Sequence, residues 1–279
     1  MAIKYITFEC VSRCDMNCGF CFSYWRDGAP EVGTEKAKDM IRQLRDQGLE
    51  AINYTGGEPL LRKDLPELLR FSKDLGLTTI VTTDGIPLKR KLGEIADRMD
   101  YLGLPLDSAN STIHNKMRIT KATDNHYGLV LGLLDTLHDD YSHIGVKINT
   151  VVTKRNLGSI AGIGGLVKGK AISWKLSQFL PAAYGALHRT NFEITREEYD
   201  AEVRRCREAD SGVPLVISPA NSCDDCCRVL SANGELMQPN GNKLVSLGGI
   251  STLNKDEIVR GFNEEDNMRA LNKTYLTPK

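Results

Sequence analysis

Short apolar stretches recur along the chain, and a stretch with helical periodicity follows most of them. Residues 2–9 alternate and are rich in β-branched and aromatic side chains, which is typical of a strand. The later stretches that we interpret as strands are 49–54, 78–83, 101–106, 145–152 and 172–179. The predicted helices are 34–47, 64–75, 88–99, 124–138, 156–167 and 195–209.

Capping residues mark where several of these helices begin. Thr34 and Asp64 stand at the start of their helices, and Glu67 gives the second a pattern similar to a capping box. Thr195 and Glu198 form the same pattern ahead of the last helix. We therefore expect the side chains of Thr34, Asp64 and Thr195 to accept hydrogen bonds from the first helical turns.

Strands that alternate with helices predict a parallel sheet with right-handed crossovers. Six strand–helix units within residues 1–210 suit an α/β fold, a partial (β/α)6 barrel related to the TIM barrel. Residues 211–279 are then a C-terminal extension that could serve as a lid or auxiliary segment, with a hairpin at 228–238 that turns at Gly234.

Candidate functional residues gather where the predicted strands end. A cysteine-rich loop follows the first strand, a Gly-Gly-Glu-Pro turn follows the second, and polar residues lie at or near the ends of the others. Those polar residues are Asp84, Asp107, Asn149 and Gln178. Because parallel strands finish at one edge of the sheet, these loops should form a single site.

The cysteine loop carries Cys14, Cys18 and Cys21 in a C-x3-C-x2-C pattern. Thiolates favour iron–sulfur clusters, zinc and copper(I). Since a four-iron cluster normally takes four cysteines, three leave one iron open to another ligand. A zinc site is the alternative, although no second Cys/His pair lies nearby. Cys10 shares a strand face with apolar residues and is predicted to be a core thiol.

Composition narrows the remaining function classes. The 279 residues are 41% hydrophobic and 26% charged, with 36 basic and 36 acidic side chains. This balance indicates neither a nucleic-acid-binding nor a membrane surface, and no apolar stretch approaches twenty residues. With no export signal visible, the eight cysteines are expected to be reduced thiols and metal ligands in a cytoplasmic protein.

The cysteine triplet, together with the turn Gly56-Gly57-Glu58-Pro59, resembles the radical S-adenosylmethionine (SAM) superfamily. The resemblance implies a 4Fe-4S cluster whose open iron binds SAM. An electron from the reduced cluster then cleaves SAM to methionine and a 5′-deoxyadenosyl radical, which abstracts hydrogen from a substrate. It also implies an external electron donor such as flavodoxin or ferredoxin.

The same resemblance implies which residues contact SAM. The two glycines of the turn would pair with the SAM amino group, Arg118 with its carboxylate, and Asn149 with its ribose. The complete set of predicted cofactor-binding residues is Phe20, Gly56, Gly57, Glu58, Asp84, Asp107, Arg118, Asn149 and Gln178.

Further motifs, including residues 52–59 and 147–152, resemble the viperin-like members of the superfamily, which act on nucleoside triphosphates. Lys147 and Lys175 fall where those enzymes hold the triphosphate, which predicts a nucleotide substrate. Ala51 and Ser173 replace two further cations of that pattern, which would weaken triphosphate binding by several kcal/mol at about 1.5–3 kcal/mol per charge-assisted bond. A substrate with fewer charges therefore stays open.

Two alternatives remain at this point. Late cysteines could hold a second cluster, as in radical SAM enzymes that modify peptides; they are Cys206, Cys223, Cys226 and Cys227. However, adjacent cysteines rarely bind one metal together, and Cys206 shares a helix face with Tyr199 and Val203, which indicates a core position. The other alternative is a non-catalytic iron–sulfur or zinc protein.

Overall fold

The computed structural model describes residues 1–23, 30–220, 222 and 226–275. Its described strands form one sheet in the order β10-β9-β8-β1-β2-β3-β4-β5-β6-β7. Neighbouring strands from β1 to β7 pair in parallel, and so do β8 and β1. The strands are β1 Tyr5–Val11, β2 Ala51–Gly56, β3 Thr78–Thr82, β4 Tyr101–Pro105, β5 Gly145–Val152, β6 Ser173–Gln178, β7 Leu215–Ser218, β8 Val229–Leu230, β9 Glu235–Asn240 and β10 Lys243–Gly249.

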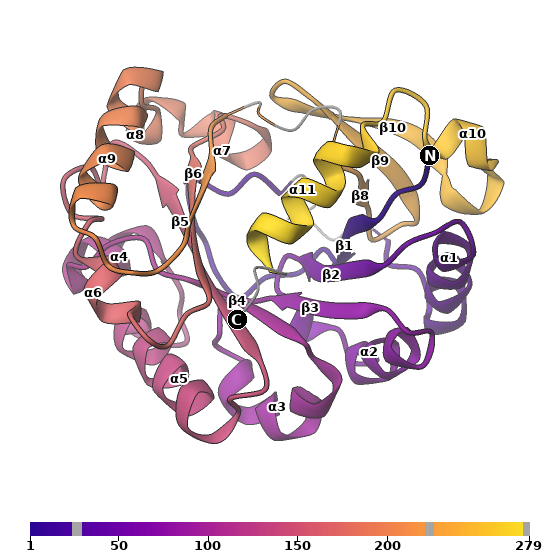
Figure 1. The fold of residues 1–279 in the computed structure, drawn as a ribbon, viewed down its shortest axis with the longest axis horizontal. Helices are drawn as coiled ribbons and strands as arrows, with labels where there is room; N and C mark the ends of the chain where they lie inside the picture. Colours follow the sequence, from indigo (N-terminus) through magenta and orange to yellow (C-terminus); the bar gives the residue numbers. More distant parts are fainter. Residues whose placement is uncertain (24–29, 221, 223–225, 276–279) are drawn as a thin grey trace.

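The sheet curves, and most helices cover its outer face (Figure 1). The helices are α1 Thr34–Asp46, α2 Leu65–Asp74, α3 Leu88–Ile95, α4 Ser111–Met117, α5 His126–Asp140, α6 Ile163–Val167, α7 Ala183–Leu187, α8 Arg189–Phe192, α9 Arg196–Glu208, α10 Lys255–Ile258 and α11 Glu264–Thr274. A large apolar core fills the space between the sheet and the outer helices. Within the described residues, no helix combines the length and apolar character needed to cross a membrane.

The six predicted strands are confirmed as β1 to β6, and the fold is the predicted parallel α/β barrel type. The capping box of Thr195 and Glu198 is present at the start of α9. The predicted hairpin is formed by β8 and β9, with Gly234 at a positive φ of 88° between them. Strand periodicity, capping residues and turn glycines are all local sequence signals, so each of these elements can be predicted from its own stretch of residues.

Two predicted caps are wrong. Gly33 occupies the N-cap position of α1, so Thr34 is already the first helical residue. Asp64 is at the N-cap of α2, but its side chain makes no capping bond. Its carboxylate instead pairs with Arg62, with Nε 2.9 Å from Oδ1. Because the Asp64 carboxylate is paired with Arg62, it does not accept a hydrogen bond from the first turn of the helix.

Two helix predictions also need correction. The predicted helix at 156–167 is helical only in α6, because Gly158 has a φ of 76° and the Asn156 side chain binds backbone groups. Conversely, α4 lies in a stretch for which we predicted no helix. Asn110 caps it by accepting a hydrogen bond from the backbone N–H of Ile113. Such a short helix has too few apolar positions to reveal a period.

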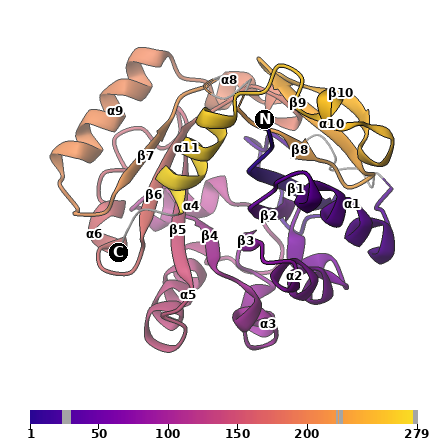
Figure 2. The same ribbon diagram turned by 45° about the vertical axis from the view of Figure 1, so that its right-hand side comes forward.

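The segment after residue 210 contributes to both edges of the sheet. β7 extends it beside β6, whereas β8, β9 and β10 extend it beyond β1. α11 lies inside the ring of outer helices in both views (Figures 1 and 2). It contacts the N-terminal end of β1, since Asn267 hydrogen-bonds the backbone of Lys4 and Tyr5. This is the edge opposite the cysteine loop, so α11 does not cover that loop as a lid.

Candidate active site

The cysteine loop leaves the C-terminal end of β1 and folds against neighbouring loops. Cys18 is buried, whereas Cys14 and Cys21 are half-buried. Backbone N–H groups of Met16 and Ser23 donate to the Cys14 and Cys21 sulfurs at 3.4 and 3.5 Å. The three thiols that the sequence pattern predicted as ligands therefore share one loop with backbone donors already directed at two of the sulfurs.

The spacing of these sulfurs tests the alternative of a zinc site. The three Sγ atoms do not all lie within 4.8 Å of one another. With Zn–S bonds of about 2.3 Å, two thiolates on one tetrahedral zinc lie about 3.8 Å apart. A 4Fe-4S cluster, in which each cysteine binds a different iron, does not require the sulfurs to lie this close. Burial raises the pKa of the Cys14 thiol to about 12 in the metal-free protein, so metal binding must displace its proton.

The Gly-Gly-Glu turn packs directly on the first residues of the cysteine loop. Gly57 N–H donates to the Val11 carbonyl and Glu58 N–H to the Arg13 carbonyl, both at 2.8 Å. Gly56 has a φ of 141°, and a Cβ on either glycine would overlap these carbonyl oxygens. The glycines thus allow the turn and the cysteine loop to touch, which places both beside any bound cluster.

Glu58 connects the ends of two strands. Its carboxylate is fully buried and accepts hydrogen bonds from Leu60 N–H at 3.0 Å, the Thr83 hydroxyl at 2.8 Å and Asp84 N–H at 2.8 Å. Burial raises its pKa to about 7. In the structure this side chain positions the turn after β2 and the loop after β3; its predicted contact with SAM stays a prediction.

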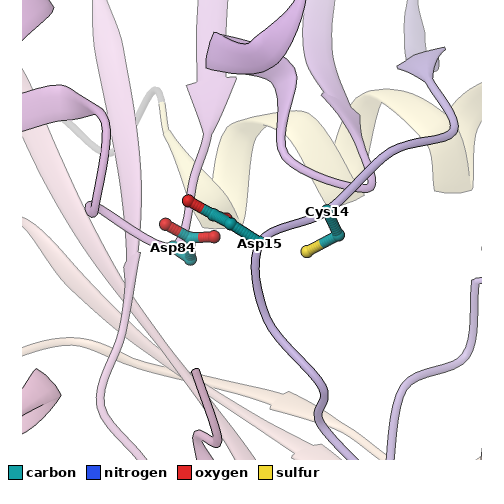
Figure 3. Close-up of side chains that lie close together, drawn as sticks. All are labelled: Cys14, Asp15 and Asp84. Atoms are coloured by element: carbon teal, nitrogen blue, oxygen red, sulfur yellow. The ribbon is translucent and has the colours of Figure 1, made fainter. Parts of the chain in front are cut away.

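Asp84 lies beside the cysteine loop and supplies one of two unpaired acceptors. One oxygen of Cys14's neighbour Asp15, one oxygen of Asp84 and the Cys14 sulfur lie within 4.8 Å of one another (Figure 3). Asp15 Oδ1 and Asp84 Oδ2 are buried without a hydrogen-bond partner. Burial, then the charge of Glu58, raises the pKa of Asp84. Because a raised pKa favours the protonated carboxyl, Asp84 can share its proton with the neighbouring Asp15 carboxylate, and a cation bound beside them would favour release of that proton.

Arg118 is paired within the protein. Its Nε lies 2.6 Å from Oδ2 of Asp107, which is fully buried and also accepts the backbone N–H of Val151. The guanidinium stacks on the Phe20 ring at 4.9 Å, and Nη1 is 3.9 Å from the Cys18 sulfur. Burial opposes the charged form, but Asp107 and Cys18 raise the pKa of Arg118 overall. The predicted residues Phe20, Asp107 and Arg118 thus meet at the cluster loop.

Two histidines that we did not predict connect the loops after β3 and β4. Asp107 N–H donates to His114 Nδ1 at 3.1 Å, His114 Nε2 bonds His126 Nδ1 at 2.8 Å, and His126 Nε2 bonds the Asp84 carbonyl at 2.8 Å. A backbone donor at one end and a carbonyl at the other fix both rings as neutral Nε2–H tautomers. Burial lowers the pKa of His114 to about 3 and that of His126 to about 4.

Asn149, Lys147 and Lys175 lie on the inner face of the barrel. Asn149 and Lys175 are paired in register, and the outer face of their strands carries core residues such as Ile148 and Trp174. The Asn149 amide lies over Gly103. Lys147 is nearer the N-terminal edge and only 5% exposed, with Nζ 3.0 Å from the Tyr275 hydroxyl.

Gln178, another predicted site residue, lies at the end of β6 and hydrogen-bonds backbone groups. Its Nε2 donates to the Ile194 and Thr195 carbonyls at 3.4 Å, and its Oε1 accepts from Ala220 N–H at 3.2 Å. Both ends of the amide are thus engaged with backbone at the start of α9 and near β7. Its predicted contact with SAM stays a prediction.

The late cysteines lie in different environments. Cys206 is a core residue of α9, 2% exposed, as the sequence predicted, and Cys10 is likewise fully buried. Cys226 is in a disulfide, so the expectation that all eight cysteines are reduced thiols is wrong for this residue. Its sulfur is 4.0 Å from that of Cys227. Cys223 falls outside the described residues. Within the part of the chain that the structure describes, no group of three metal-ligating side chains includes Cys206, Cys226 or Cys227.

Two relatives with named activities match long parts of the chain. An S-adenosylmethionine-dependent nucleotide dehydratase of Lacinutrix mariniflava is 32% identical over 76% of this chain, which spans 46% of that protein's length. A GTP 3′,8-cyclase of Marinobacter nauticus is 28% identical over 95% of this chain and 85% of its own. The chain thus spans only about half the length of the first of these relatives.

Solved structures and a family profile give the wider relationship. SuiB of Streptococcus suis, bound to its precursor peptide SuiA, has the same fold with a TM-score of 0.71 at 16% identity, over 96% of this chain and 67% of SuiB. A structure of anSMEcpe with bound AdoMet and a peptide has a TM-score of 0.71 at 15% identity, over 94% of this chain and 82% of anSMEcpe. The Radical SAM superfamily profile matches residues 8–154, more than half of the 279 residues. The chain therefore belongs to the radical SAM superfamily, whose members use a 4Fe-4S cluster and SAM.

Proposed function

We propose that this radical SAM enzyme abstracts hydrogen from a nucleotide, in a viperin-like dehydration or a related reaction. The observation that carries the proposal is a pair of lysines, Lys147 and Lys175, on the inner face of the barrel. Within the described residues, neither amine forms an ion pair with a carboxylate. Burial lowers the pKa of both, so an anion that enters the barrel would restore their charged forms.

The names of the two relatives described above support a nucleotide substrate. One is a nucleotide dehydratase and another a GTP cyclase, and the second covers nearly all of this chain. Both names describe a nucleotide as the molecule acted on. The peptide-bound structures are 15–16% identical and support the fold alone.

The proposed roles follow from where each side chain lies. Cys14, Cys18 and Cys21 hold the cluster, which with SAM supplies the electron and the 5′-deoxyadenosyl radical. Arg118, held by Asp107, is directed toward the cluster loop and is placed to take the SAM carboxylate. On the inner face of β5, the amide of Asn149 can donate hydrogen bonds to ribose hydroxyls and accept hydrogen bonds from them.

Lys175 is the proposed phosphate ligand. It is half-buried and one strand away from Asn149, to which it is paired in register. An ammonium group at this position binds a phosphate as a point charge, without the bidentate geometry of an arginine. The nucleotide would therefore enter from the edge that carries the cysteine loop and direct its phosphates toward the opposite edge.

The proposal is tested by SAM cleavage under anaerobic conditions. Reconstituted, reduced enzyme is incubated with SAM and each nucleoside mono-, di- and triphosphate, and 5′-deoxyadenosine is quantified. We expect at least one nucleotide to stimulate cleavage, and deuterium on its ribose to appear in 5′-deoxyadenosine. Lys175→Met should raise its KM about 10- to 150-fold, the effect of one charge-assisted bond of about 1.5–3 kcal/mol. Lack of stimulation by every nucleotide would refute the proposal.

We also propose that an acidic flavodoxin- or ferredoxin-type protein of a reducing cytoplasm delivers the electron. A hollow of about 180 Å³ on the outer side of the cysteine loop is lined by Asn17, Gly19, Lys116 and Arg155, and both cations are exposed. Basic side chains steer an acidic partner, and electron-transfer complexes need little buried area. Lys116→Glu should slow SAM cleavage driven by flavodoxin while cleavage driven by dithionite is unchanged; equal rates with flavodoxin would contradict this docking site.

A further inference from the structure

α11 closes the end of the barrel that lies opposite the cysteine loop. Asn267, 1% exposed, holds the helix in place: its Oδ1 accepts from the N–H groups of Lys4 and Tyr5, and its Nδ2 donates to the carbonyls of Tyr5 and Cys226. Four hydrogen bonds from one buried amide fix the helix against the start of β1. Figures 1 and 2 both draw it within the ring of outer helices.

The last described residue of this segment, Tyr275, points into the barrel. Its ring is 2% exposed and lies 6.3 Å from the ring of Tyr5 and 5.3 Å from that of Tyr101. It also packs in one apolar cluster with Ala51 and Ile80. We call these five residues (Tyr5, Ala51, Ile80, Tyr101 and Tyr275) the barrel floor.

Tyr275 contacts the amine of Lys147 with both its hydroxyl group and its ring. The hydroxyl is 3.0 Å from Nζ, and the ring centroid is 4.4 Å from Nζ. A hydroxyl oxygen and an aromatic face are both favourable neighbours of an ammonium group, but neither supplies the counter-charge that would keep this buried amine protonated. Lys147 therefore has the surroundings of an anion-binding cation whose anion position is filled by a neutral side chain.

Lys175 lies nearer the entrance than Lys147. It pairs in register with Asn149, two residues further along β5 than Lys147, which corresponds to roughly 6.6 Å of strand. Lys175 is half-buried, whereas Lys147 is 5% exposed. An anion that enters from the cysteine-loop edge meets Lys175 first and reaches Lys147 only if the Tyr275 side chain gives way.

We propose that Tyr275 limits how deep an anionic substrate can enter, so that its terminal phosphate stops at Lys175. The inference rests on the proposed function and adds its substrate class: a nucleotide with a short phosphate chain, a mono- or diphosphate, rather than a triphosphate. The physical reason is steric and electrostatic together, since the ring fills the space beside Lys147 and the hydroxyl takes the hydrogen bond that a further phosphate would need.

The test compares four variants of the holoenzyme. Tyr275→Ala opens the floor, Tyr275→Phe keeps the ring, and Leu271→Ala loosens α11 elsewhere in the same apolar cluster. The fourth combines Tyr275→Ala with Lys147→Met. For each, kcat/KM is measured with the mono-, di- and triphosphate of the stimulating nucleoside. We expect Tyr275→Ala alone to shift the preference toward the triphosphate by about tenfold, the effect of roughly 1.4 kcal/mol from one new phosphate contact.

A binding measurement separates this inference from the proposed function. Titration calorimetry with inorganic phosphate, pyrophosphate and tripolyphosphate needs no turnover. Tyr275→Ala should bind tripolyphosphate more tightly than the parent enzyme and take up protons, and Lys147→Met should abolish both gains. If no nucleotide stimulates cleavage but these gains are seen, the proposed function fails and the depth limit stands for another anion.

Two results would overturn the depth limit. One is stimulation by nucleotides with an unchanged preference in Tyr275→Ala and no gain in tripolyphosphate affinity. The other is an equal shift in Leu271→Ala, which would trace the effect to a loosened helix. Should Tyr275→Ala fail to fold, Tyr275→Leu provides the same comparison, because leucine keeps an apolar contact with the floor yet offers Lys147 no hydroxyl.

Discussion

The Asp107–Arg118 pair is the part of the site whose removal should have the largest effect on stability. Asp107→Asn conserves shape and keeps the oxygen that accepts the Val151 N–H at 2.9 Å. It replaces the oxygen 2.6 Å from Arg118 Nε with an NH2 group, so two donors face each other and the guanidinium loses its counter-charge. The side chains are 0% and 15% exposed, so water compensates little.

Removing one partner of a buried ion pair costs about 3–5 kcal/mol. We expect the lower end for Asp107→Asn, about 3 kcal/mol, because the Arg118 side chain retains some access to solvent and the Cys18 sulfur lies 3.9 Å away. A loss of this size multiplies the unfolding equilibrium constant roughly 150-fold. The KM for SAM should rise as well, since Arg118 would no longer be held toward the cluster loop.

Urea unfolding of the metal-free protein measures the first effect, and a double-mutant cycle isolates it. The four proteins are the parent, Asp107→Asn, Arg118→Met and the double variant. The double variant should lose about 2 kcal/mol less than the sum of the single losses, because it leaves neither charge unpaired. A loss below about 1 kcal/mol in Asp107→Asn, or additive losses, would refute the argument that these charges depend on each other.

Three further predictions concern the scaffold of the site. Gly57→Ala should prevent the turn after β2 from packing on the cysteine loop, because the added Cβ would overlap a carbonyl oxygen. The variant should bind less SAM and less iron than the parent, and equal binding of both would contradict this prediction. His126 is neutral when folded, with a pKa lowered to about 4, whereas an unfolded histidine titrates near 6.5, so its contribution to stability is present above about pH 6.5 and is lost as the pH falls toward 4. Buried carboxyl groups with a raised pKa make the folded protein more stable as the pH falls, which is the opposite effect. The measurement is therefore the difference in urea midpoint between the parent and His126→Gln, taken at pH 7 and at pH 4.5. An equal difference at both pH values would be evidence against a buried, neutral His126. Cys18→Ala should abolish iron binding while Cys10→Ala retains it, as measured by iron content after reconstitution, because Cys10 is fully buried in the core; iron loss in Cys10→Ala would reveal a fourth protein ligand.

Most of the fold and the centre of the site follow from local sequence signals. Strands β1 to β6 have their own hydrophobic patterns, and the three cysteines lie within one short loop. Parallel strands end at one edge of their sheet, so the positions of the Gly-Gly-Glu turn, Asp84 and Asp107 at strand ends are sufficient to assign all three to one region. The physical basis is that each of these signals is encoded within a few adjacent residues.

Other features depend on partners that are distant in the chain. Gln178 ends a strand as Asn149 nearly does, yet its amide binds backbone groups near residues 194 and 220. His114 and His126 hydrogen-bond each other and connect the loops after β3 and β4, and no periodic sequence pattern predicts this contact. A polar side chain near a strand end is equally suited to a ligand or to backbone, and only the neighbours brought by folding decide between them.

The barrel floor shows this division most clearly. From the sequence alone, Lys147 is a cation on an inner strand face, which is sufficient to predict that it meets an anion. The structure instead places Tyr275 against it, a residue 128 positions later in the chain. The local sequence pattern determines the strand face on which a side chain lies, because this face depends on adjacent residues. The group that packs against that side chain comes from a distant segment, so only the tertiary structure decides which group it is.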